Sequence, residues 1–134
     1  MDATPLRLNP GDDLRRTLDA ALALHGCAAA FVVAGIGSLS AARLRFAGVE
    51  TPEALAGDLE ILTLSGTLSP DGSHLHMSVA DAQGQIFGGH VAPGCVVRTT
   101  AEVLVAWLPE WRLTREFDAA TGYAELTIRK AEDR

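Results

Sequence analysis

The chain has 134 residues, which is enough for one domain with a buried core and too few for two ordinary domains. Hydrophobic residues make up 48% of it and charged residues 21%, and this balance excludes an intrinsically disordered protein. The net charge is −6 and no basic run occurs, which argues against binding to a nucleic-acid backbone, because lysine and arginine must cluster to overcome the repulsion.

One helix is predicted near the start of the chain. Residues 11–13 (Gly-Asp-Asp) place negative charge where a helix would begin, and an apolar stripe with helical spacing follows from Leu14 to Leu22. The helix is predicted to end at Gly26, since glycine adopts the left-handed conformation that ends many helices. We interpret His25 as a partner for the negative end of the helix dipole and not as a metal ligand.

Strand patterns fill most of the remaining chain. Residues 27–36 form an apolar run without polar alternation, which predicts a strand covered on both faces, and residues 35–39 predict a turn. Further strands are predicted at residues 42–46, 59–68, 95–108, 111–117 and 123–129, with a hairpin over residues 73–90. We therefore predict an α+β fold in two layers, in which one or two helices pack on a mostly antiparallel central sheet, as a single domain spanning residues 1–134.

The segment Gly35-Ile36-Gly37-Ser38 has a second interpretation, because a glycine-rich turn after an apolar strand can bind phosphate. A full dinucleotide fingerprint needs a third glycine and a helix directly after it, whereas residues 39–42 lead into another strand pattern. A tight turn is therefore the preferred interpretation.

The hairpin over residues 73–90 carries three of the four histidines. Polar and apolar side chains alternate over residues 74–79, which is typical of a half-buried strand. Residues 81–84 fit a type I turn with Gly84 in a left-handed bulge position, and this turn pairs Asp81 with Gln85. Counting outward from that pair places His90 directly opposite His76.

The turn type decides whether the histidines form a site. With the bulge, His74, His76 and His90 share one face, because directly opposed residues have Cβ atoms about 5 Å apart. A two-residue turn would instead pair His90 with Leu75 and send it to the other face. Three converging imidazoles suit zinc or another divalent metal and leave a fourth position for water. The alternative is a polar surface, solvated or facing another subunit, that holds no metal.

No signal peptide is predicted, since residues 1–14 lack a basic region followed by an apolar one. No membrane span is predicted either, because Arg98 and Glu102 interrupt the longest apolar segment. Cys27 and Cys95 lie far apart in apolar segments and are interpreted as free thiols of a reducing compartment. These features predict a cytoplasmic protein without a membrane partner.

Several segments occur in an order and at a spacing that match a known family. They are Leu8-Asn9-Pro10-Gly11-Asp12-Asp13-Leu14, Gly35-Ile36-Gly37-Ser38-Leu39, LEILTLSGTLS at 59–69, Asp71-Gly72-Ser73-His74-Leu75-His76, Gly88-Gly89-His90-Val91 and Arg98-Thr99-Thr100-Ala101-Glu102. Together they resemble the plants-and-prokaryotes-conserved (PPC) domain, over nearly the whole chain. The resemblance implies a stand-alone bacterial member with a largely antiparallel sheet and a homotrimeric assembly. In plants the domain follows AT-hook motifs in transcription factors, but this chain has no Arg-Gly-Arg-Pro AT-hook.

Three functions follow from these observations. The first is a homotrimeric protein whose His74, His76 and His90 bind zinc, another divalent metal or a small ligand, and an open zinc position would permit hydrolytic or lyase-like chemistry. The second is a DNA-associated regulatory protein, which the resemblance suggests and the net charge disfavours. The third is a structural or interaction protein without a metal. The sequence does not decide whether the protein is an enzyme.

Overall fold

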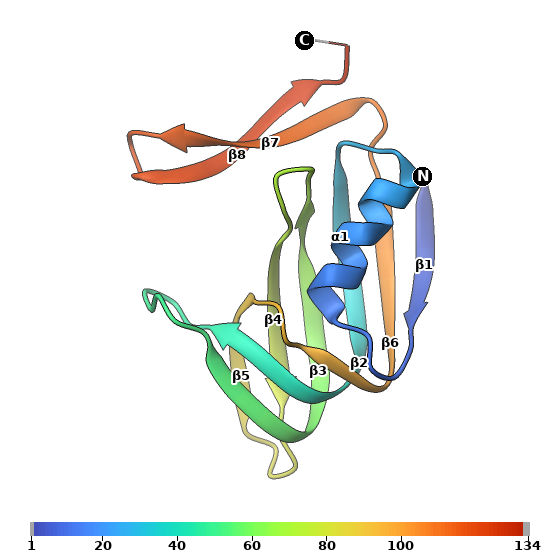
Figure 1. The fold of residues 1–134 in the computed structure, drawn as a ribbon, viewed down its shortest axis with the longest axis vertical. Coiled ribbons are helices and arrows are strands. Elements are labelled where there is room, and N and C mark those ends of the chain that lie inside the picture. Colours follow the sequence, from blue (N-terminus) through green and yellow to red (C-terminus); the bar gives the residue numbers. More distant parts are fainter. Residues whose placement is uncertain (1, 133–134) are drawn as a thin grey trace.

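Eight strands and one helix make up residues 2–132, the part of the chain that the computed structural model describes (Figure 1). Six strands form one sheet, antiparallel at each pairing, in the order β1-β6-β2-β3-β4-β5, and β7 and β8 pair separately. The elements are β1 (Ala3–Leu8), α1 (Leu14–His25), β2 (Ala30–Arg45), β3 (Glu53–Leu68), β4 (His74–Ala80), β5 (Ile86–Val91), β6 (Val96–Trp107), β7 (Trp111–Asp118) and β8 (Tyr123–Lys130).

The helix α1 lies against one face of the sheet (Figure 1). Its first turn is capped by the carboxylate of Asp13, which accepts a hydrogen bond of 3.1 Å from the backbone N–H of Arg16. It ends at Gly26, whose backbone is left-handed, as the sequence predicts. Three leucines four residues apart point into the core and are buried: Leu14, Leu18 and Leu22.

The end of β2 closes part of the sheet on itself. Besides β3 and β6, β2 also pairs with β5, through Leu44 with Val91 and Arg45 with His90. Strand β5, at the end of the strand order, therefore pairs with β4 on one side and with β2 on the other. Strands β2 to β5 curl into a partly closed barrel. In Figure 1 the end of β2 runs beside β5 at the lower left.

The predicted α+β class and the mostly antiparallel sheet are confirmed, although the helical part is a single element of 12 residues. Within residues 2–132 no helix combines the length and apolar character that crossing a membrane requires. Cys27 and Cys95 are free thiols. Burial raises the pKa of the Cys95 thiol, which keeps it protonated and unreactive.

Two predictions about β2 are wrong. The turn expected at residues 35–39 does not form, because β3 and β6 pair with β2 from both sides and shifts in register absorb the irregular sequence there. The expected cover on both faces is also missing in the described chain. Phe31, Val33 and Ile36 are 40%, 49% and 54% exposed on the face opposite the core. β2 is therefore one strand with a buried and an open side.

The strand pair β7–β8 forms where the sequence predicts it and is anchored at its base. Leu113 is buried, and its backbone N–H donates to the carbonyl of Ala28 at 3.1 Å. Arg115 donates from its backbone N–H to the Asp71 carboxylate at 2.9 Å and from its guanidinium to the Thr67 hydroxyl at 3.0 Å. These bonds hold the pair beside the turn that leads into β4.

Candidate metal centre

A tight turn sets the register of the strands that carry the three histidines. The backbone N–H of Asp81 donates to the carbonyl of Gln85 at 2.9 Å, and Gly84 has a φ of 78°. The Asp81 carboxylate also accepts the backbone N–H groups of Gln83 and Gln85, each at 2.9 Å. This is the predicted turn with its left-handed bulge, and the resulting pairs match the prediction.

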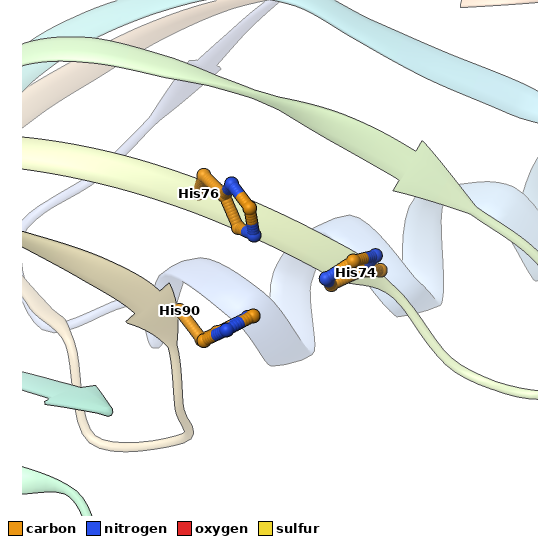
Figure 2. Close-up of side chains that lie close together, drawn as sticks. All are labelled: His74, His76 and His90. Carbon is orange, nitrogen blue, oxygen red and sulfur yellow. The ribbon is translucent and has the colours of Figure 1, made fainter. Parts of the chain in front are cut away.

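The register brings His74, His76 and His90 to one place on the outer face of β4 and β5. His76 lies directly opposite His90, and the three side chains point toward one another (Figure 2). The ring centroids of His76 and His90 are 4.6 Å apart, those of His74 and His76 4.9 Å, and those of His74 and His90 5.3 Å. One nitrogen from each ring lies within 4.8 Å of the others, so the predicted convergence is present.

The donor set fits a divalent metal ion. Zinc binds imidazole nitrogen at about 2.0–2.1 Å, so a tetrahedral ion holds its nitrogen ligands about 3.4 Å from one another. The three nitrogens lie within 4.8 Å of one another, so rotations of the side chains must bring them closer together to reach that spacing. His74 and His76 are exposed and free to rotate, while the residues between and after them, Leu75 and Met77, are buried and fix the strand beneath.

Desolvation and nearby positive charges favour the neutral form of two of the imidazoles, those of His74 and His90. Partial desolvation of the imidazole is the main cause that holds the pKa of His74 below its ordinary value; the Arg115 guanidinium and the two neighbouring imidazoles lower it further, and Glu125 opposes them. Burial also lowers the pKa of His90, followed by the Arg45 guanidinium and the imidazole opposite. A lowered pKa favours the neutral ring at neutral pH, and the neutral ring is the form that binds a metal.

The other motifs singled out in the sequence lie elsewhere. His25 stacks on the Trp107 ring, with centroids 4.0 Å apart, at the end of α1. Gly35 and Gly37 lie inside β2, so the phosphate-binding loop considered for them is not formed. Gly37 pairs with Ala101 of β6 as part of the sheet.

Three residues beside the cluster have no counterpart in the sequence-based prediction of the site: Arg15, Arg45 and Ser73. They share a pocket with His74 and His90. Arg45 comes to the cluster through the pairing of β2 with β5, and Arg15 comes from the helix. No local motif marks either contact, because both depend on elements far apart in the sequence.

The profile of the Plants and Prokaryotes Conserved (PCC) domain matches residues 1–109. The chain is 52% identical over 124 residues to the bifunctional protein GlmU of Synechococcus sp. (strain JA-2-3B'a(2-13)). That match covers 92% of this chain and 20% of the relative, so the chain spans about a fifth of the length of the curated relative.

Solved structures share the fold over nearly the full chain. A hypothetical protein from Salmonella cholerae-suis is 40% identical, with a TM-score of 0.93 over 96% of this chain and 94% of that one. A metal-containing protein from Archaeoglobus fulgidus is 29% identical, with a TM-score of 0.81 over 95% and 94%. A candidate DNA-binding protein from Ralstonia eutropha is 24% identical, with a TM-score of 0.81 over 93% and 90%, which shows the fold alone.

Proposed function

Because the chain belongs to the plants-and-prokaryotes-conserved domain family, we propose that residues 1–134 act as one homotrimeric domain whose three histidines bind a divalent metal ion, zinc being the first choice. The observation that carries the metal proposal is the convergence of His74, His76 and His90, with one nitrogen from each within 4.8 Å of the others. A similar protein from Archaeoglobus fulgidus is described as metal-containing, which supports the proposal.

The three imidazoles would hold the ion, and the fold would supply their orientation. Zinc with three protein ligands keeps a fourth position open and acts there as a Lewis acid on a bound oxygen. The buried underside of β4 keeps His74 and His76 on one face. The pairing of Arg45 with His90 fixes β5 from its other side. The chain's own contribution is therefore a pair of strands that presents three imidazole donors on one face.

Zinc or a similar divalent ion is expected to copurify with the protein when it is produced without a histidine tag. A ligand that binds only the folded state adds about 2.7 kcal/mol to its stability at a concentration of one hundred times its dissociation constant. Elemental analysis and thermal unfolding with EDTA, then with added zinc, measure both effects. Metal-free protein whose melting temperature does not respond to zinc would contradict the proposal.

The homotrimer follows from the family resemblance and is supported by an open apolar surface. Side chains on the face of the sheet opposite α1 are apolar and exposed by 36–54%: Phe31, Val33, Ile36, Leu62 and Leu104. An apolar patch of this kind on a small protein usually marks an interface. We place the contacts between subunits on this face.

Light scattering at micromolar concentration is expected to give about three times the chain mass of 14.1 kDa. Ile36→Glu should reduce the mass to that of one chain, since a buried unpaired carboxylate opposes association. Leu24→Glu is the matched control, because Leu24 is 88% exposed on α1, which packs on the other face of the sheet. A monomer mass for the unchanged protein would refute the trimer.

The protein is expected to bind DNA weakly. Non-specific affinity comes mainly from lysine and arginine that neutralise phosphates, whereas this chain carries 17 acidic against 11 basic residues. Assembly into a trimer would multiply the negative charge. A titration of duplex DNA at several salt concentrations tests this, and a sub-micromolar dissociation constant at about 150 mM salt with a steep salt dependence would favour the regulatory function instead.

A further inference from the structure

A pocket of about 220 Å³ lies beside the three histidines, between the helix and strands β2, β4 and β5. His74 and His90 form part of its wall, and Arg15, Arg45 and Ser73 form another part. Pockets for drug-sized ligands usually exceed about 300 Å³, so this one suits a smaller molecule. Because the pocket adjoins the histidines, a ligand on the open side of the cluster would lie in it.

Two guanidinium groups give the pocket a local positive charge in a chain whose net charge is −6. Arg15 donates one hydrogen bond of 2.9 Å to the carbonyl of Val91, and Arg45 donates one of 3.3 Å to the carbonyl of Val49. The only carboxylate paired with either one among residues 2–132 is Asp19, whose oxygen lies 4.0 Å from Arg15. An arginine has five N–H donors, so these contacts orient both side chains and leave most donors free.

Ser73 adds a donor that the protein itself does not use. The residue is 6% exposed, and its hydroxyl oxygen is buried without a hydrogen-bond partner in the described part of the chain. Buried polar groups are nearly always paired, because leaving one unpaired costs free energy. The Ser73 hydroxyl is closed off from solvent, and a rotation of its side chain toward the pocket that the residue lines would give it a partner that accepts a hydrogen bond.

We propose that Arg15, Arg45 and Ser73 form an oxyanion subsite, and that the ligand of the histidine centre is a small molecule carrying a phosphate group. The donors come from three separate segments of the chain, which suits a group with three terminal oxygens better than a two-oxygen carboxylate. His74 and His90 border the same pocket, so a second oxygen of such a ligand would reach the open metal position. That second contact rests on the proposed metal site, whereas the phosphate subsite does not.

Calorimetric titration of inorganic phosphate into the metal-free and the cobalt-loaded protein tests the subsite, at fixed ionic strength. Arg15→Gln and Arg45→Gln are expected to weaken phosphate binding by about tenfold or more, since each removes charge-assisted hydrogen bonds. Ser73→Ala should weaken it by about threefold while the thermal stability of the free protein stays the same or rises, because the unpaired hydroxyl is gone. Arg16→Gln is the matched control: Arg16 is the exposed neighbour of Arg15 on α1 and should not change the affinity.

The visible absorption of bound cobalt separates this inference from the metal proposal. The subsite is refuted and the metal centre stands if cobalt binds and phosphate does not. The same conclusion holds if Arg45→Gln and Ser73→Ala bind phosphate as tightly as the unchanged protein. If cobalt fails to bind but phosphate binds with the expected dependence on Arg45, the metal proposal falls and the subsite stands. Acetate that binds as tightly as phosphate would overturn the choice of phosphate. Should Arg15→Gln not fold, Arg45→Gln and Ser73→Ala decide the outcome.

Discussion

Replacing His90 with alanine is expected to lower the affinity of the protein for zinc by at least about 100-fold. Loss of a group that merely orients a metal ligand already costs 10–100-fold, so loss of a ligand should reach or exceed the upper end. His90 is the only one of the three that β5 supplies, and without it two imidazoles on a single strand remain. Competition for zinc with a chromophoric chelator measures the dissociation constant.

The fourth histidine provides a matched control for this experiment. His25 stacks on Trp107 at the end of α1 and takes no part in the cluster, so His25→Ala should keep the zinc affinity of the unchanged protein. The metal-free His90→Ala variant should unfold at nearly the same denaturant concentration as the metal-free parent, because His90 is half-buried on the outer face. Equal losses of zinc affinity in the two variants, or none in either, would contradict the site.

The histidine cluster could be predicted from the sequence because its geometry depends on one short hairpin. Asp81 and Gly84 specify the turn, the turn specifies the register, and the register places His90 opposite His76. Each step is local. Alternation along β4 then settles which face the side chains take, since Leu75 can be buried only if the histidines point outward.

The surroundings of the cluster could not be predicted in this way. Arg45 reaches it because β2 is long enough to pair with β5 after pairing with β3 and β6, and Arg15 reaches it because the helix crosses the same end of the sheet. These are pairings between distant segments. Local sequence patterns carry little information about them, because several partners would satisfy the same strand equally well.

The errors in β2 have a related cause. The apolar composition of residues 27–36 correctly indicates a strand, but it cannot tell what covers each face. The two glycines at 35 and 37 favour a turn in isolation, and pairing on both edges overrides that preference. The strand β1 is absent from the prediction because its sequence pattern is weak. It is a short strand that pairs with β6, and Pro5 argues against a strand.

Alanine at Gly66 is expected to lower the free energy of unfolding by about 3 kcal/mol, more than most single substitutions do. Gly66 has a φ of 150° on β3 and faces Leu75 of β4. A Cβ atom there would meet the carbonyl oxygen of His74 and the Cα of Leu75 at less than van der Waals distance. Those are backbone atoms, so relief requires the two strands to move apart. Urea denaturation gives the change by linear extrapolation.

Strand β5 offers a control that separates this clash from a general cost of replacing sheet glycines. A Cβ at Gly88 would lie 3.5 Å from the nearest atom, the Met77 carbonyl oxygen, and its φ is not positive, so Gly88→Ala should change stability by less than about 1 kcal/mol. Gly66 also faces the residue between His74 and His76, so separating β3 from β4 would displace both ligands. Gly66→Ala should therefore lose zinc affinity as well as stability, whereas Gly88→Ala should keep both. Equal stability of the two variants would show that β3 and β4 do not approach as closely as this pairing requires.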